Sequence, residues 1–253
     1  MAIGIELTGR VAIVTGAGRG IGRAIALSLA QAGADVCLTA RTESQLEETA
    51  ERVRSLGRSA VTVAADATDP AAAAKVVARA VESLGGLHLL VNNAGMELPK
   101  PLLDTSEEEY GRVMDTNVKS AFLFTKAAGP HLIAQKYGRI VNMASVGGLA
   151  AGPNQAIYQV SKAALAHFTK SMAIEWARHN ITVNAVAPGW IRTEIISHFA
   201  DDPKKLEGYL KPIPLRRLGE PEEIGPLVAY LCSDLASFMT GSIVVIDGGL
   251  LIP

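Results

Sequence analysis

Short apolar runs alternate with longer helical patterns along nearly the whole chain. The runs that predict strands are residues 11–15, 35–40, 60–65, 87–94, 139–145, 181–187 and 242–247. Most are continuously apolar and β-branched, as in parallel strands that are covered on both faces. The helical patterns between them lie at residues 20–32, 43–56, 70–84, 106–135, 155–179 and 221–232. This alternation predicts an α/β fold, a single doubly wound parallel sheet over residues 1–253.

Composition excludes several other classes of protein. Of 253 residues, 49% are hydrophobic and 19% are charged, enough apolar material for a substantial core. The net charge of -1 and the lack of a long basic run argue against a nucleic-acid partner. No apolar run reaches membrane-spanning length, and the five histidines lack metal-ligand spacing. Cys37 and Cys232 lie in apolar segments, so we expect buried free thiols in a cytoplasmic protein without a metal site.

A glycine-rich loop follows the first predicted strand and begins the first predicted helix. It reads TGAGRGIG at residues 15–22 and fits the spacing T-G-x-x-x-G-x-G, with Gly16, Gly20 and Gly22. Glycines let a phosphate approach the backbone, and a helix N-terminus supplies free amides and the positive end of its dipole. A glycine cluster alone is weak evidence, but the strand-loop-helix setting predicts a dinucleotide site.

The end of the second predicted strand indicates which dinucleotide binds. Sites for NAD usually carry an acid there that binds the ribose 2′-hydroxyl. Here the sequence continues with Ala40 and Arg41, and the first acid is Glu43. Arg41, with Arg19 in the glycine loop, would favour a 2′-phosphate. We therefore expect NADP(H), although solvated arginines with no such role are the simpler alternative.

Together with later motifs, these residues resemble the short-chain dehydrogenase/reductase family over essentially the whole chain. The matching motifs are TGAGRGIG at 15–22, Asp66, NNAG at 92–95, Asn117, Ser145, YQVSK at 158–162, PGWIRT at 188–193 and IDGG at 246–249. The Y-x-x-x-K pair alone is poor evidence, but the order and spacing of the set are those of the family. The resemblance implies a Rossmann-like domain with a seven-stranded sheet and helices on both faces.

The resemblance also assigns roles to individual residues. It implies a catalytic tetrad of Asn117, Ser145, Tyr158 and Lys162. It implies coenzyme contacts from the glycine loop, from the ends of the second to fourth strands, from the tetrad and from the PG segment: Gly16, Arg19, Gly20, Ile21, Gly22, Arg41, Asp66, Asn93, Ala94, Gly95, Tyr158, Lys162, Pro188, Gly189, Ile191 and Thr193. Substrate contacts are expected from Ser145, Gln155, Tyr158 and Trp190.

Tyr158 and Lys162 suit the reduction of a ketone. A free phenol has a pKa of about 10, too high for efficient proton exchange at neutral pH. Lys162 lies one helical turn away, so we expect its charge, with that of an oxidised nicotinamide, to lower the pKa of Tyr158. Ser145 would bind the substrate oxygen. Asn117, in a long predicted helix, resembles the family residue that holds a water between the lysine and solvent.

The substrate is less strongly indicated than the reaction. The sequence is nearest the 3-oxoacyl-(acyl carrier protein) reductase branch, through Arg19, GRIVNMASV at 138–146 and Gln155. Arg178, with Lys136 and Arg139, would form a basic patch for an acidic carrier protein. The segment MELPKPLLDTS after NNAG departs from that branch. Sugar-acid or polyol dehydrogenation and reduction of another ketone therefore remain open, as does a non-catalytic binding module, which the complete tetrad disfavours.

Two further expectations concern the surface. Residues 190–219 interrupt the alternation and are rich in proline and charge, yet they carry Trp190, Ile195, Ile196, Phe199, Tyr209 and Leu210. That composition suits a substrate lid, with an irregular surface loop as the alternative. The helices at 106–135 and 155–179 carry apolar residues beyond what one buried face needs, among them Ala163, Ala164, Phe168 and Met172. We expect this surplus to join subunits in a homotetramer.

Overall fold

All seven predicted strands pair in one parallel sheet with the order β3-β2-β1-β4-β5-β6-β7. The computed structural model describes residues 4–196 and 203–252. The strands are β1 (Val11–Thr15), β2 (Asp35–Ala40), β3 (Ala60–Ala64), β4 (Leu89–Asn92), β5 (Gly138–Met143), β6 (Ile181–Pro188) and β7 (Ile243–Ile246). The order reverses between β1 and β4, which places the mouth of a ligand crevice beyond the carboxyl ends of these two strands.

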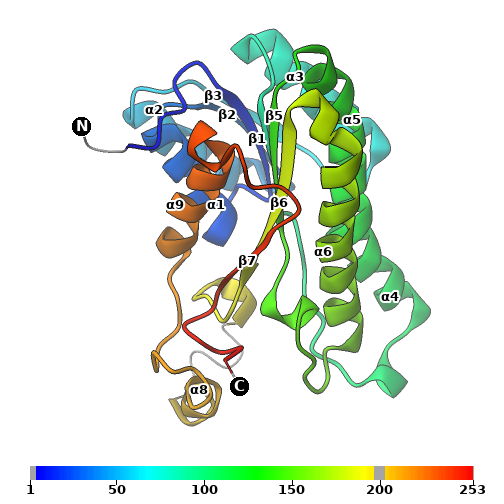
Figure 1. The fold of residues 1–253 in the computed structure, drawn as a ribbon. Helices are drawn as coiled ribbons and strands as arrows, with labels where there is room; N and C mark the ends of the chain where they lie inside the picture. Colours follow the sequence, from blue (N-terminus) through cyan, green and yellow to red (C-terminus); the bar gives the residue numbers. More distant parts are fainter. Residues whose placement is uncertain (1–3, 197–202, 253) are drawn as a thin grey trace.

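Helices cover both faces of the sheet, as the alternation predicts (Figure 1). The longer ones are α1 (Gly20–Gln31), α2 (Glu43–Ser55), α3 (Pro70–Leu84), α4 (Glu107–Met114), α5 (Ser120–Ala134), α6 (Ala156–Trp176), α8 (Pro203–Leu210) and α9 (Pro221–Cys232). Side chains of α1, α2 and α9 share one buried cluster, and those of α3, α5 and α6 share another on the opposite face. The predicted three-layer, Rossmann-like architecture is therefore confirmed.

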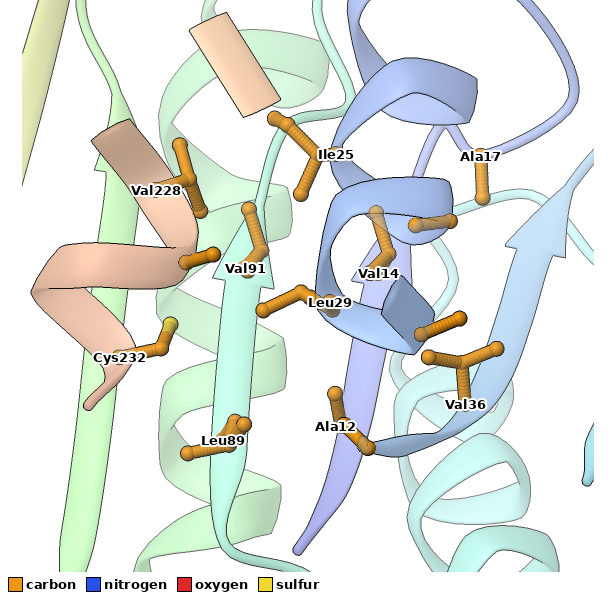
Figure 2. Close-up of a cluster of buried hydrophobic side chains, with 14 of the residues drawn as sticks. Ala12, Val14, Ala17, Ile25, Leu29, Val36, Leu89, Val91, Val228 and Cys232 are labelled. Atoms are coloured by element: carbon orange, nitrogen blue, oxygen red, sulfur yellow. The ribbon is translucent and has the colours of Figure 1, made fainter. Parts of the chain in front are cut away.

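Apolar side chains of α1 and α9 hold one layer onto the centre of the sheet. Figure 2 shows Ile25 and Leu29 of α1 beside Val14 and Val91 of the sheet, with Val228 of α9 completing the cluster. All five side chains are fully buried. Burial of each contributes about 1.5–3 kcal/mol, so this layer fixes the glycine loop that precedes α1 on a rigid base.

The helix predicted over 106–135 is not uniform. It consists of α4, a π-helical segment at Asp115–Lys119 and α5. The π segment contains Asn117, so the widened turn lies where the sequence predicts a catalytic residue; π turns are frequent at such sites. A capping box starts α4: Ser106 accepts from the Glu109 amide, and the Glu109 carboxylate accepts from the Ser106 amide.

The segment 190–219 contains more regular structure than its composition predicts. It includes a short 3-10 turn at Glu194–Ile196 and helix α8, which lies beyond the end of the sheet (Figure 1). Trp190, Tyr209 and Leu210 pack around Ile196 and Leu218 in a small apolar cluster. Phe199 lies outside the described residues. The described part of this segment therefore packs around its own apolar side chains and is not an irregular surface loop. We call these residues, 190–196 and 203–219, the flap.

One expected surface residue is buried. The Arg139 side chain is only 2% exposed, so it cannot join Arg178 and Lys136 in a docking patch. Its guanidinium stacks 4.2 Å from the Tyr137 ring centroid and donates to Asp234 at 3.0 Å. Tyr137 donates its hydroxyl to the same carboxylate. Arg139 thus anchors the amino end of β5 to the turn after α9.

Removing the Asp234 carboxylate should destabilise the protein, because it leaves buried Arg139 without its charged partner. We expect Asp234→Ala to lower the free energy of unfolding by about 1–3 kcal/mol, measured by urea denaturation. The control is Asp115→Ala, since Asp115 pairs with exposed Lys119 at the surface and should cost under about 0.5 kcal/mol. Equal losses in the two variants would contradict the anchoring role of Asp234.

Candidate active site

The glycine loop and the NNAG segment meet at the crevice between β1 and β4. Asn93 donates its side-chain amide to the Thr15 carbonyl at 2.9 Å and to the Gly16 carbonyl at 3.2 Å. The Thr15 hydroxyl accepts from the amides of Asn93 and Ala94, both at 2.9 Å. Adjacent parallel strands bring these loops together, and the Asn93 side chain fixes their separation.

The glycine loop fits the pyrophosphate of a dinucleotide. Gly16 and Gly20 have positive φ angles of 65° and 53°, and α1 begins directly after Arg19. A Cβ on Gly22 would lie 2.1 Å from the Gly16 carbonyl oxygen, so only glycine lets the helix start this close to the loop. The free amides at the start of α1 therefore face the crevice, where an anion is stabilised. Ile21, on the first turn of α1, is partly buried.

The residues expected at the adenosine end are placed around the ends of β2 and β3. Arg41 directly follows β2 and is exposed, with no acid at the strand end. Hydrogen bonds from Thr68 lower the pKa of Asp66, and the charge of Arg41 adds to the effect. Arg19 forms an ion pair with Glu194 of the flap. Arg41 could therefore bind a 2′-phosphate directly, whereas Arg19 would first have to release Glu194.

Lys162 and Asn117 converge beside Gly95. The Lys162 ammonium is buried and donates to the Met143 carbonyl at 2.8 Å, at the end of β5. A Cβ on Gly95 would lie 3.3 Å from Lys162 Nζ and 3.4 Å from Asn117 Oδ1. Asn117 accepts from the Met96 amide and donates to the Met96 carbonyl, at 2.8 and 2.9 Å. The π turn thus presents Asn117 to the loop after β4.

Tyr158 and Ser145 form the other half of the predicted tetrad. Ser145 follows β5 and accepts from the Gly147 amide at 3.1 Å. A Cβ on Gly147 would lie 3.5 Å from both the Ser145 hydroxyl oxygen and the Tyr158 ring, so the two side chains lie close together. The expected lowering of the Tyr158 pKa is wrong for the protein alone. Burial raises the pKa of Tyr158, the Ser145 hydrogen bond opposes this rise, and the charge of Glu97 adds to it. Burial also lowers the pKa of Lys162 to about 8, which weakens its influence as a cation.

The PG segment closes the crevice from the side of β6. Pro188 ends β6, and the Gly189 amide donates to the Ile246 carbonyl of β7. Ile191 is buried, and the Thr193 side chain lies 3.3 Å from the place of a Cβ on Gly20. Pro188, Gly189, Ile191 and Thr193 therefore lie between the glycine loop and β7, where the nicotinamide half of a coenzyme would fit.

The two expected substrate residues outside the tetrad, Gln155 and Trp190, lie on different elements at the same end of the sheet. Gln155 is the residue before α6, three positions from Tyr158, and it makes no side-chain cap. Trp190 packs edge-on against Tyr209 of α8, with ring centroids 5.2 Å apart. Trp190 thus belongs to the apolar cluster that includes Tyr209 and Leu210 of α8.

Three further residues contribute to the site, although the sequence motifs do not predict a role for them. Glu97 lies two residues after NNAG, and its charge raises the pKa of Tyr158. Ser161 accepts from Asn117 at 2.9 Å and donates to the Tyr158 carbonyl at 2.6 Å. A Cβ on Gly148 would lie 2.7 Å from the Lys162 carbonyl carbon, so glycine lets the loop after Ser145 pack on α6. An acid two residues after a coenzyme motif was the signal for Glu97, and Ser161 lies within YQVSK itself.

This geometry agrees with comparisons to known proteins. A family model described as enoyl-(acyl carrier protein) reductase matches residues 16–251. The chain belongs to the short-chain dehydrogenase/reductase family. It is therefore an oxidoreductase of the NAD(P)-dependent type. No helix in the described part of the chain is long and apolar enough to span a membrane.

Relatives within the family differ in what they act on. The chain is 42% identical to oxidoreductase UcpA of Salmonella typhimurium, over 98% of this chain and 97% of UcpA. It is 38% identical to the 3-oxoacyl-[acyl-carrier-protein] reductase FabG of Aquifex aeolicus, over 97% and 99%. A gluconate 5-dehydrogenase from Burkholderia cenocepacia, solved with NADP and tartrate, superposes with a TM-score of 0.93 at 33% identity, over 97% and 96%. The family is thus established, and the substrate is not fixed by similarity.

Neutralising Glu97 should change the pH dependence of ketone reduction. With Tyr158 as the expected proton donor, reduction would need a protonated Tyr158, so the rate would fall as pH rises through the pKa of Tyr158. Because the charge of Glu97 raises that pKa, Glu97→Gln should lower it and move the alkaline fall of kcat/KM to lower pH. The control is Glu108→Gln, which changes an exposed acid on α4. An alkaline limb that stays in place would contradict the electrostatic coupling.

Proposed function

We propose that this dehydrogenase/reductase uses NADP(H) to reduce a ketone to a secondary alcohol, with Tyr158 as the proton donor. The observation that carries the proposal is the convergence of Ser145, Tyr158, Lys162 and Asn117 at the carboxyl end of β5, beside a glycine loop that fits a pyrophosphate. A binding module has no need of this set of groups. The hydride would come from the coenzyme.

Each residue of the site has a distinct part in the proton transfer. The Ser145 hydroxyl binds the substrate oxygen and holds it within reach of the Tyr158 hydroxyl. Tyr158 gives its proton to the oxygen as negative charge develops there. Lys162 is held by Met143 at one end of the site, and its pKa of about 8 lets it exchange a proton near neutral pH. Asn117 keeps the loop after β4 in place beside Lys162.

Preference for NADP(H) is supported at the end of β2. Arg41 is the first residue after the strand, and no acid is present to bind a ribose 2′-hydroxyl. Hydrogen bonds from Thr68 and the charge of Arg41 lower the pKa of Asp66, so the carboxylate stays ionised at this end of the crevice. The NADP that accompanies the Burkholderia structure belongs to that protein and is consistent with this preference.

A 3-oxoacyl thioester is the substrate we favour. The family model carries the name of an acyl-carrier-protein enzyme, and FabG is similar over nearly its whole length. The apolar flap cluster around Trp190 and Ile196 offers a surface for an acyl chain. An acidic carrier protein would have to dock through Arg178 or other exposed cations, because Arg139 is buried.

A sugar acid or polyol is the second candidate. The Burkholderia gluconate 5-dehydrogenase has nearly the same fold, and the loop after NNAG carries polar groups that a hydroxylated substrate can use. Glu97 near Tyr158 would accept hydrogen bonds from substrate hydroxyls, but it would repel a carboxylate. This favours polyols over sugar acids within the alternative. Reduction of another small ketone is the third candidate.

We also propose that the enzyme works as a cytoplasmic homotetramer. Phe122 on α5 and Val160 and Ile174 on α6 are exposed apolar side chains, with Ile174 84% exposed. Two such helices from each of two subunits would form a four-helix contact. Light scattering at micromolar concentration tests this; a monomer would contradict it.

Tyr158→Phe keeps the aromatic ring and removes only the acidic proton. We expect turnover to fall by at least about a hundredfold, because general acid catalysis contributes on that scale. NADPH binding, measured by fluorescence titration, should stay within about twofold of wild type, since the hydroxyl makes one contact among many. Turnover near that of wild type would contradict the role of proton donor.

Arg41→Gln tests the choice of coenzyme. Losing a charge-assisted hydrogen bond to the 2′-phosphate should raise the Kd for NADPH about tenfold and leave that for NADH unchanged. Arg52→Gln is the matched control, because Arg52 lies exposed on α2 and pairs with Glu48. A wild-type enzyme that prefers NADH, or equal effects on both coenzymes, would contradict the NADP(H) assignment.

The substrate is tested by NADPH oxidation, followed optically, with acetoacetyl thioesters, simple ketones, keto-sugars and keto-sugar acids in parallel. We expect the highest kcat/KM with the thioesters. Activity with keto-sugars and none with thioesters would replace the first candidate with the second. A protein that turns over none of these classes while it binds NADPH would contradict the proposed reaction class.

A further inference from the structure

A chain of buried polar side chains crosses the molecule between α5 and α6, outside the catalytic tetrad. Asn92 on β4 donates to Thr125 on α5 at 3.1 Å and to Asn142 Oδ1 on β5 at 2.8 Å. Asn142 in turn donates to the Thr169 hydroxyl on α6 at 2.9 Å. Thr125, Asn142 and Thr169 are at most 1% exposed, and Asn92 is 4% exposed. These side chains lie within an otherwise apolar layer. Their directional hydrogen bonds therefore specify how α5 and α6 are aligned on the sheet.

The hydrogen bonds fix the direction of each group in the chain. The Asn142 amide has its oxygen toward Asn92 and its amino group toward Thr169. The Thr169 hydroxyl gives its one proton to the Leu165 carbonyl at 2.9 Å and receives the bond from Asn142. Sliding α6 along β5 would break the bond between Asn142 and Thr169 and leave a buried amide without a partner.

Thr169 lies on the same face of α6 as Lys162. Seven residues make almost two full helical turns, so the two side chains project toward β5 about 10 Å apart along the helix axis. Their partners are consecutive residues of the sheet: Thr169 binds the Asn142 side chain, and Lys162 binds the Met143 carbonyl. Two contacts at different points along α6 determine both its axial position and its tilt against β5. With only one of the two contacts, either the axial position or the tilt could still change.

We propose that Thr169 and Asn142 are positioning residues for catalysis, which set α6 on β5 so that Lys162 reaches Met143 and Tyr158 reaches Ser145. Neither residue touches the reacting atoms. The inference rests on the proposed function of Tyr158 and Lys162, and it adds a cause for their geometry. Ser145, in the loop directly after β5, lies close to Tyr158 on α6, so an error in helix position would appear at both catalytic pairs.

The test compares Thr169→Val with Thr169→Ser. Valine keeps the shape and removes the hydroxyl, whereas serine keeps the hydroxyl and removes a methyl group. We expect Thr169→Val to lower kcat about tenfold, because displacements below 1 Å are costly in a positioned site. The pH profile of kcat should also shift, since the Lys162 contact changes. Thr169→Ser should retain both the rate, within about twofold, and the wild-type profile.

The matched control is Ser171→Ala on the same helix. Ser171 also bonds the carbonyl four residues earlier, that of His167, but it is exposed on α6 and bonds no strand. We expect its removal to leave kcat and the pH profile unchanged. If the valine variant does not fold, Thr169→Ala gives the same comparison, because the space beside Asn142 then admits a water.

A merely structural role makes a different prediction. In that case Thr169→Val lowers the urea midpoint, and the folded enzyme keeps the wild-type kcat and pH profile; this result would overturn the proposal. Tyr158→Phe in the same assays separates this failure from failure of the proposed function. An active Tyr158→Phe variant contradicts the proposed function itself. An inactive one, together with an unchanged Thr169→Val variant, contradicts only the positioning role.

Discussion

The hydrogen bond from Lys162 to the Met143 carbonyl is the contact on which the rest of the site depends. It holds a buried ammonium at the carboxyl end of β5, where burial alone would favour the neutral amine and lower the pKa to about 8. The same contact ties the first two turns of α6, which carry Tyr158, to the end of β5. Gly148 permits the close packing of the loop after Ser145 against this helix turn. The end of β5, the loop after Ser145 and α6 therefore all meet at Lys162.

The fold was predictable because its signals are periodic and repeated. Continuous β-branched runs separated by helical patterns leave few arrangements other than a covered parallel sheet, and all seven strands pair as parallel neighbours. Element ends were less well predicted: the fourth strand was expected over 87–94 and spans Leu89–Asn92. The π segment around Asn117 has no periodic signal, because a single widened turn leaves the apolar pattern on both sides almost unchanged.

The candidate site was predictable where a motif has a geometric reason and not where a contact depends on packing. Gly16 and Gly22 had to be glycines because the backbone of the loop passes too close for a Cβ. By contrast, no pattern reveals that buried Arg139 pairs with Asp234 or that Arg19 meets Glu194, since the partners in both pairs are far apart in the sequence. The pKa of Tyr158 was misjudged for a related reason. Burial, the largest effect on it, follows from the packed structure and not from the spacing of Tyr158 and Lys162.

Substrate choice and proton transfer are linked in this site through the loop after β4. Asn117 holds the backbone of Met96 from both sides, and Glu97 comes next in the chain. The charge of Glu97 raises the pKa of Tyr158, the proposed proton donor, so this loop helps to set that pKa. In the proposed enzyme, an acid at this position would favour substrates that bring a hydrogen-bond donor or no charge at all. A change at Glu97 would then alter specificity and pH dependence together, whereas a change in the apolar cluster around Trp190 and Ile196 would act through packing alone.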